Sequence, residues 1–234
     1  MNEDFEKIWC DFVDFRAEFT QDLNFRDQHS KFVLAYWARV NSLCSDVMIL
    51  IKNGGYASVP IIMRSSLESL VDLRCLLIDS SYIDRIFASQ SESEYKHMKQ
   101  YSDTNPYYLG SSPVNGETLD KLKPIKRSLD IAAKFKKAGC EELYSTVYNQ
   151  LCRHAHGNIT ALASKHFEDE NIVLKSNIKD SELLFILSST INAAVVSTHD
   201  LLEFFDIDDV NLKRCLDFSE RVKKLNQKFV QQKI

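Results

Sequence analysis

The fold of this chain is arranged around residues 140–158, which read CEELYSTVYNQLCRHAHGN. At about 100° per residue, one face of a helix here would carry the apolar side chains Tyr144, Val147, Tyr148, Leu151 and Ala155. His154 and His156 fall on opposite margins of that face, and Arg153 falls behind it. Gly157 can end the helix, which places His156 in the last turn, where the helix dipole favours an imidazolium. The stretch therefore predicts a helix that is buried on one side and carries polar, reactive groups at one end.

The chain as a whole has the composition of a helical globular protein. It contains 234 residues, of which 44% are hydrophobic and 26% charged, and only 6 Gly and 4 Pro interrupt it. We predict an all-α bundle of six to eight helices that forms one domain over residues 1–234. Within it, residues 1–28 form a docking helix with buried aromatic side chains, residues 29–205 form the core, and residues 206–234 form a C-terminal helix. A small β-hairpin is expected near residues 165–175, where the helical period is lost.

Positive charge is concentrated in one segment of an otherwise acidic chain. The net charge is −4, so the whole molecule presents no general field for nucleic acid. Residues 121–138, however, carry seven basic residues against Asp130 alone, and we expect them to form one helix that starts or kinks at Pro124. This helix presents either an ordinary solvated face or a face that contacts RNA phosphates. The candidate nucleic-acid-binding residues are Lys126, Arg127, Lys134, Lys136 and Lys137.

Several classes of chemistry find no support in the sequence. The six cysteines contain no C-x-x-C pair, and the N-terminus lacks the pattern of a secretory signal, so we expect reduced thiols and a cytoplasmic location. The uncharged run 183–199 contains Ser, Thr and Asn and is read as a core helix that is buried nearly all round, which predicts no membrane association. Cys152, His154 and His156 have the spacing i, i+2, which points successive side chains about 200° apart on a helix. We therefore predict no metal site and, without a P-loop or G-x-G-x-x-G motif, no cofactor.

Arg64 and Glu68 interrupt a second, very apolar helix that we expect from Pro60 to Asp79, with Ser58 as its N-cap. The two side chains are spaced i, i+4 and can touch. They form either a structural ion pair or a buried pair that orients a further group, because two buried charges are costly without partners. We expect this helix to cross the helix Glu141–His156, so that Arg64, Glu68 and His156 approach one another.

The motifs Arg64-x-x-x-Glu68 and Tyr148-x-x-Leu151-Cys152-x-x-x-His156-Gly157 resemble those of an uncharacterised bacterial family of helical domains, which looks like a distant relative of the HEPN superfamily. The resemblance implies a HEPN-like core over residues 29–205 and a homo-oligomer. Many HEPN proteins are metal-independent endoribonucleases in which an Arg precedes a His by four to six intervening residues. The corresponding positions before His156 hold Asn149, Gln150 and Leu151, and Arg153 is closer.

Two functions follow from this resemblance. The favoured one is an interaction or sensor module of a bacterial defence or stress system, with a protein partner and no catalysis, because the Arg–His spacing is absent. The alternative is a metal-independent endoribonuclease. There, His156 would act as general acid or base, and Arg64 or Arg153 would stabilise the phosphorane. Glu68, paired with Arg64, is a further candidate catalytic residue.

Overall fold

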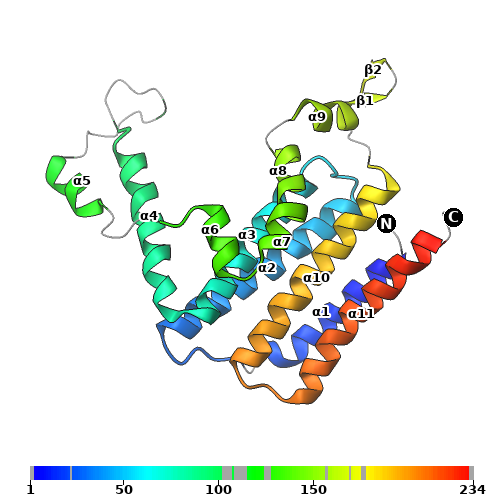
Figure 1. Cartoon of the computed structure of the whole chain (residues 1–234), viewed down its shortest axis with the longest axis horizontal. Helices are drawn as coiled ribbons and strands as arrows, with labels where there is room; N and C mark the ends of the chain where they lie inside the picture. Colours follow the sequence, from blue (N-terminus) through cyan, green and yellow to red (C-terminus); the bar gives the residue numbers. More distant parts are fainter. Residues whose placement is uncertain are drawn as a thin grey trace.

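The protein is an all-α bundle, as predicted (Figure 1). The computed structural model describes residues 3–21, 23–101, 107, 115–123, 128–155, 158–168, 170–174 and 178–231. Long helices make up most of this part of the chain: α1 (Glu3–Thr20), α2 (Gln28–Lys52), α3 (Val59–Ile78), α4 (Ile83–Met98), α10 (Asp180–Phe204) and α11 (Asp209–Gln231).

Shorter elements fill the region between α3 and α10. They are η1 (Ser80–Tyr82), α5 (Gly116–Leu122), α6 (Ile131–Lys137), α7 (Glu141–Leu143), η3 (Tyr144–Tyr148), α8 (Asn149–Ala155), α9 (Ile159–His166), β1 (Phe167–Glu168) and β2 (Asn171–Ile172). The two strands pair antiparallel, Phe167 with Ile172, within the range where the sequence predicts a small hairpin.

The starts of α2 and α3 differ in whether a side chain caps the helix. The N-cap of α2 is Asp27, whose side chain accepts from the Ser30 backbone N–H, while the Ser30 hydroxyl accepts from the Asp27 backbone. Ser30 is thus the third residue of a reciprocal capping box whose N-cap is Asp27. Ser58 is the N-cap residue of α3, as predicted, but its side chain makes no cap bond, because its own backbone is already helical. Pro60 occupies the first turn of α3, where its missing N–H costs nothing.

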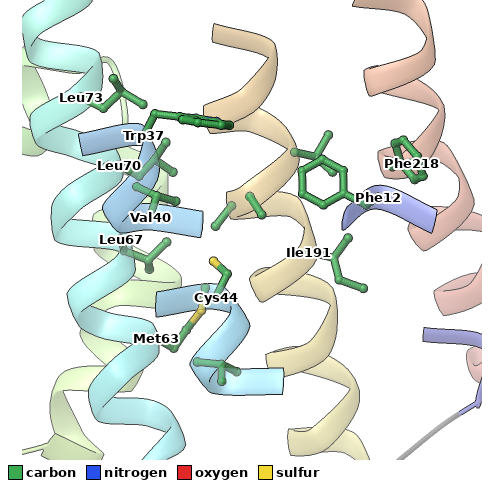
Figure 2. Packing of buried hydrophobic residues seen from close by; sticks show 14 of the residues in the cluster. Phe12, Trp37, Val40, Cys44, Met63, Leu67, Leu70, Leu73, Ile191 and Phe218 are labelled. Atoms are coloured by element: carbon green, nitrogen blue, oxygen red, sulfur yellow. The ribbon is translucent and has the colours of Figure 1, made fainter. Parts of the chain in front are cut away.

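The core lies where α2, α3 and α10 meet, and α1 and α11 cover the other side of α10 (Figure 1). Val40 and Cys44 of α2 pack toward Met63 and Leu67 of α3, and all four are buried (Figure 2). On the far side of α10, the rings of Phe12 and Phe218 meet edge to face with 5.4 Å between their centroids. The aromatic stripe of the N-terminal helix therefore docks onto the bundle, as its period indicates.

The single helix predicted over residues 121–138 is wrong. α5 ends at Leu122, residues 128–130 are not helical, and α6 begins at Ile131. Asp130 caps this new start by accepting from the Ala133 backbone N–H. Pro124 lies outside the described residues. The basic residues on either side of the break therefore do not share one helix.

Helix α10 is long and apolar enough to cross a membrane by composition, and it is the one such helix in the described part of the chain. It packs against α2, α3 and α11, as a core helix does. The expectation that it is buried nearly all round needs correction, because Ser189, Asn192 and Val196 form a half-exposed stripe. That stripe forms one wall of a groove described below.

Candidate functional site

Arg64 and Glu68 form the ion pair that their spacing predicts, and Tyr148 joins it from another helix. Arg64 Nε lies 3.0 Å from Glu68 Oε1 and donates to the Tyr148 hydroxyl at 3.2 Å. The Tyr148 hydroxyl donates in turn to Glu68 Oε1 at 2.7 Å. The Arg64 guanidinium also lies over the Tyr148 ring, 5.4 Å from its centroid. Each of the three side chains thus contacts the other two, and we call this set the Arg–Glu–Tyr triangle.

Tyr148 reaches the triangle from an irregular helical turn. The predicted helix over Glu141–His156 is helical throughout its described part, but residues Tyr144–Tyr148 form a π-helix between α7 and α8. A π-turn widens the helix, and such turns occur frequently at functional sites. The rings of Phe135, Tyr144 and Tyr148 contact one another here, with Phe135 and Tyr148 centroids 4.9 Å apart. Phe135 is fully buried, so this stack fixes the Tyr148 ring between α3 and α6.

The protonation states in the triangle follow from burial and hydrogen bonding. Burial raises the pKa of Tyr148, and its hydrogen bond to Glu68 raises it further. Burial lowers the pKa of Arg64, but the hydrogen bond to Tyr148 and the nearby Tyr148, Cys152 and Glu68 side chains outweigh this and leave that pKa raised. At neutral pH the phenol is therefore a hydrogen-bond donor and not a base. The triangle is suited to holding α3 against η3 more than to moving a proton.

The predicted partner His156 lies outside the described residues, so its approach to Arg64 and Glu68 stays a prediction. The last residue of α8 is Ala155. Arg153 is exposed on α8, and no described residue forms an ion pair with it. The structure thus brings Arg64 and Glu68 together across from α8 and leaves Arg153 at the surface.

A groove runs beside the triangle, between α3, α7 and α10. Its volume is about 640 Å³. The floor is apolar and is formed mainly by Leu67, Leu70, Val147, Ala193 and Val196. The rim carries Arg74, Asn192 and the exposed carboxylates of Glu141 and Glu142. Arg74 is held by a two-pronged ion pair with Asp200, with distances of 2.7 and 3.3 Å. No described residue pairs with either glutamate, so the rim has a surplus of negative charge.

The candidate nucleic-acid-binding residues do not present one continuous cationic face in the described part of the chain. Lys134 Nζ lies 2.9 Å from Asp72 Oδ1, and Lys137 Nζ lies 2.7 Å from Asp79 Oδ2. Both ammonium groups therefore tie α6 to α3 and its C-terminal cap. Lys136 is exposed, whereas Lys126 and Arg127 lie outside the described residues. A role for these residues in binding RNA stays a prediction.

A second polar cluster joins α8, α9 and α10. Lys165 is 6% exposed and donates to Glu182 at 2.8 Å, and His154 Nε2 lies 3.8 Å from the same carboxylate. His154 Nδ1 is buried and has no hydrogen-bond partner among the described residues. The pKa of His154 is lowered, mainly because the side chain is buried. The nearby Glu182 carboxylate raises this pKa by a smaller amount, and the Lys165 ammonium group lowers it slightly. The imidazole is therefore neutral at pH 7, and the cluster serves to anchor the start of α10.

Comparison with protein families places the site within a defined segment. Residues 30–173 match the model of a family described as "Family of unknown function (DUF5677)". The chain belongs to this family. Searches of curated proteins and of solved structures found no match. The segment shared with DUF5677 runs from the start of α2 to the hairpin and contains all three residues of the Arg–Glu–Tyr triangle.

Metal binding has one candidate set in the described part of this DUF5677 chain. His199, Asp200 and Glu203 offer ligand atoms within 4.8 Å of one another. Asp200, however, gives both carboxylate oxygens to Arg74. A metal ion bound there would have to displace the Arg74 guanidinium or lie next to it, and repulsion between the two positive charges opposes this. The residues do not fit a metal site.

Tyr148 is the site residue that sequence reasoning placed only on a buried face. Its hydroxyl lies at a position that the helical period marks as apolar, so periodicity gave no reason to assign it a polar role. The sequence did contain a signal for a polar role, because the second of the two family-like motifs begins at Tyr148 and the first is Arg64-x-x-x-Glu68. A tyrosine at the edge of a buried face needs a partner for its hydroxyl, and the nearest charged pair is a natural candidate.

Proposed function

We propose that this DUF5677 chain is a HEPN-like interaction module of a bacterial defence or stress system, which binds a partner protein in the groove between α3, α7 and α10. The observation that carries the proposal is the groove itself: an apolar floor with two exposed carboxylates, Glu141 and Glu142, on its rim. The Arg–Glu–Tyr triangle supports this role because it fixes the wall formed by η3 against α3.

The occupant that fits best is an amphipathic helical segment with a basic polar face. Apolar side chains of such a helix would enter over Leu67, Val147 and Val196, in the manner of helix-in-groove recognition. Lysine or arginine residues beside them would pair with Glu141 and Glu142. The rim cation Arg74 does not offset these glutamates, because it is already paired with Asp200.

Designed helical peptides test this proposal directly. A Leu/Lys amphipathic peptide should bind more tightly than a Leu/Glu peptide of the same apolar content, as measured by fluorescence anisotropy. The double substitution Glu141→Lys/Glu142→Lys should weaken the Leu/Lys peptide by about tenfold, which is about 1.4 kcal/mol. The matched control is Glu3→Lys/Asp4→Lys, the same charge change in the first turn of α1. Equal binding of both peptides, or equal loss in the control, would reject the groove as the binding site.

The endoribonuclease remains the second candidate because the Arg64 side chain contacts Tyr148. Tyr148 directly precedes α8, and His156 is the next residue in sequence after the end of α8. In that function the guanidinium would stabilise a phosphorane while His156 moves the proton. Purified protein should then cleave a mixed RNA pool in EDTA, and His156→Ala should abolish the cleavage. Absence of cleavage by the intact chain, or cleavage that survives His156→Ala, would count against it.

A further inference from the structure

The groove beside the triangle continues beyond its rim residue Arg74. A second pocket of about 500 Å³ lies on the other side of that side chain, between the last turns of α3 and α10. Among the described residues, Arg74 is the one that lines both hollows. Leu77, Ile78 and Phe204 give the second pocket an apolar lining. The groove and the second pocket thus follow one another along the line where α3 and α10 meet, which we call the α3–α10 seam.

Each of the two helices presents one continuous stripe to the seam. The residues of α3 that line it are Leu67, Leu70, Arg74, Leu77 and Ile78. Those of α10 include Ser189, Asn192, Val196, Asp200 and Phe204. At about 100° per residue, each set falls within about 120° of its helix circumference. From Ser189 to Phe204 the seam extends about 22 Å, which is the length of about four helical turns.

Arg74 divides the seam and brings hydrogen-bond donors to it. Its Nε and Nη2 atoms donate to Asp200 at 2.7 and 3.3 Å, and Nη1 donates to the Cys140 sulfur at 3.5 Å. A guanidinium has five N–H donors and these contacts use three, so two have no partner in the described part of the chain. The Arg74 side chain is 33% exposed, which lets a ligand reach it. The seam therefore offers donors at its divider and apolar surface on both sides.

From this arrangement we infer that the partner helix carries apolar anchors over about four turns, interrupted by one glutamine or asparagine that faces Arg74. The inference rests on the proposed function and specifies the partner's sequence. An apolar side chain over Arg74 would leave buried donors unpaired. A carboxylate is disfavoured because Asp200 already neutralises the guanidinium, and Glu141 and Glu142 on the same rim would repel it. A neutral amide meets neither obstacle.

The charges at the two ends of the seam favour lysine or arginine beside the apolar anchors. Glu141 and Glu142 stand at the groove end. At the other end, Glu203 lines the second pocket and keeps 60% of its side chain exposed. His199 Nδ1 lies 3.5 Å from this carboxylate and pairs with it only when the imidazole is protonated. One basic helix is thus complementary to both ends.

Three helical peptides of equal length and charge test the inference by fluorescence anisotropy. The first is a Leu/Lys peptide with a four-turn apolar stripe and a central Gln. The second has Leu at the centre, and the third has Ser in place of Leu in one half of the stripe. The first should bind about fivefold more tightly than the second and about tenfold more tightly than the third. Arg74→Lys, which keeps the charge but not the planar fork, should reduce the preference for Gln over Leu.

A surface substitution in the second pocket separates the two halves of the seam. Ile78→Ser should weaken the first peptide by about fivefold and leave the third unchanged. Ile78 is 61% exposed, so the fold does not depend on it. The matched control is Ile49→Ser, because Ile49 is 59% exposed on α2 and lines neither hollow. It should change the binding of neither peptide.

Equal binding of the first and third peptides, or equal effects of Ile78→Ser and Ile49→Ser, would end the binding site at Arg74 and overturn the inference. Tighter binding of the central-Leu peptide would reject the amide. In each of these cases the groove proposal would stand. Glu141→Lys/Glu142→Lys should weaken the first and third peptides alike, since both cover the groove. Absence of binding by all three peptides would instead reject the proposed function, and this inference with it.

Discussion

At the scale of single residues, the Tyr148 hydroxyl links two segments that are 80 residues apart in sequence. It donates to Glu68 and accepts from Arg64, so both its hydrogen-bonding directions are used. Glu68 keeps 37% of its side chain exposed and Arg64 keeps 25%. Solvent therefore screens the charge–charge part of the triangle, and we assign more of its strength to the hydrogen bonds of the phenol.

This assignment predicts a measurable coupling. Tyr148→Phe should lower the free energy of unfolding by about 1–2 kcal/mol, because it removes a hydrogen bond to a carboxylate. Combined with Glu68→Gln in a double-mutant cycle, it should show a coupling of about 1 kcal/mol. Urea denaturation followed by circular dichroism measures both. Tyr144→Phe is the matched control, since its ring stacks on Tyr148 and no described residue bonds its hydroxyl. A Tyr148→Phe variant that unfolds like Tyr144→Phe would show that the triangle does not stabilise the fold.

At the scale of elements, two devices position the site. The π-turn Tyr144–Tyr148 widens the helix at the point where three aromatic rings must fit between α3 and α6. The aromatic stripe of α1 covers the side of α10 that faces away from the groove. α10 thus has one side fixed by α1 and α11, while its half-exposed stripe forms the groove wall.

Docking of α1 should rest on a few buried rings. Phe12 is fully buried and contacts Phe218 and Trp9, with centroid distances of 5.4 and 5.8 Å. Phe12→Ala should therefore lower the free energy of unfolding by about 3–5 kcal/mol, through lost burial and the cavity left behind. Phe25→Ala is the control, because that ring is 60% exposed and should cost less than about 1 kcal/mol. If both variants unfold at the same urea concentration, α1 is an appendage and not part of the core.

At the scale of the whole molecule, charge is distributed in local patches within a chain of net charge −4. Lys134 and Lys137 neutralise carboxylates of α3 and of its cap, so the basic segment contributes less outward field than its sequence indicates. The homo-oligomer expected from the family resemblance stays a prediction, which light scattering of the purified chain would check.

RNA binding by the basic segment, if it occurs, should show the signature of phosphate contacts. The affinity for a mixed RNA should fall steeply with salt, since bound counterions are released on binding. Replacing Lys134, Lys136 and Lys137 with Gln should weaken it further and make the salt dependence shallower. Filter binding over a range of salt concentrations measures both. Because two of these lysines hold α6 in place, a melting curve of the variant must accompany the titration. Unchanged RNA affinity in a folded triple variant would leave the lysines as an ordinary solvated and ion-paired face.

Features that depend on local spacing along the chain were predictable without a structure. Apolar residues at helical period predicted the all-α bundle and the buried face of residues 140–158, on which Tyr148 and Leu151 are buried. The i, i+4 spacing predicted the contact between Arg64 and Glu68. The contacts across the bundle could be read only from the folded chain: Tyr148 with that pair, Lys137 with Asp79, and the glutamates of α7 beside the apolar floor of the groove. The physical reason is that such contacts depend on how helices cross and on one π-turn, whereas hydrophobic period records only which side of each helix is buried.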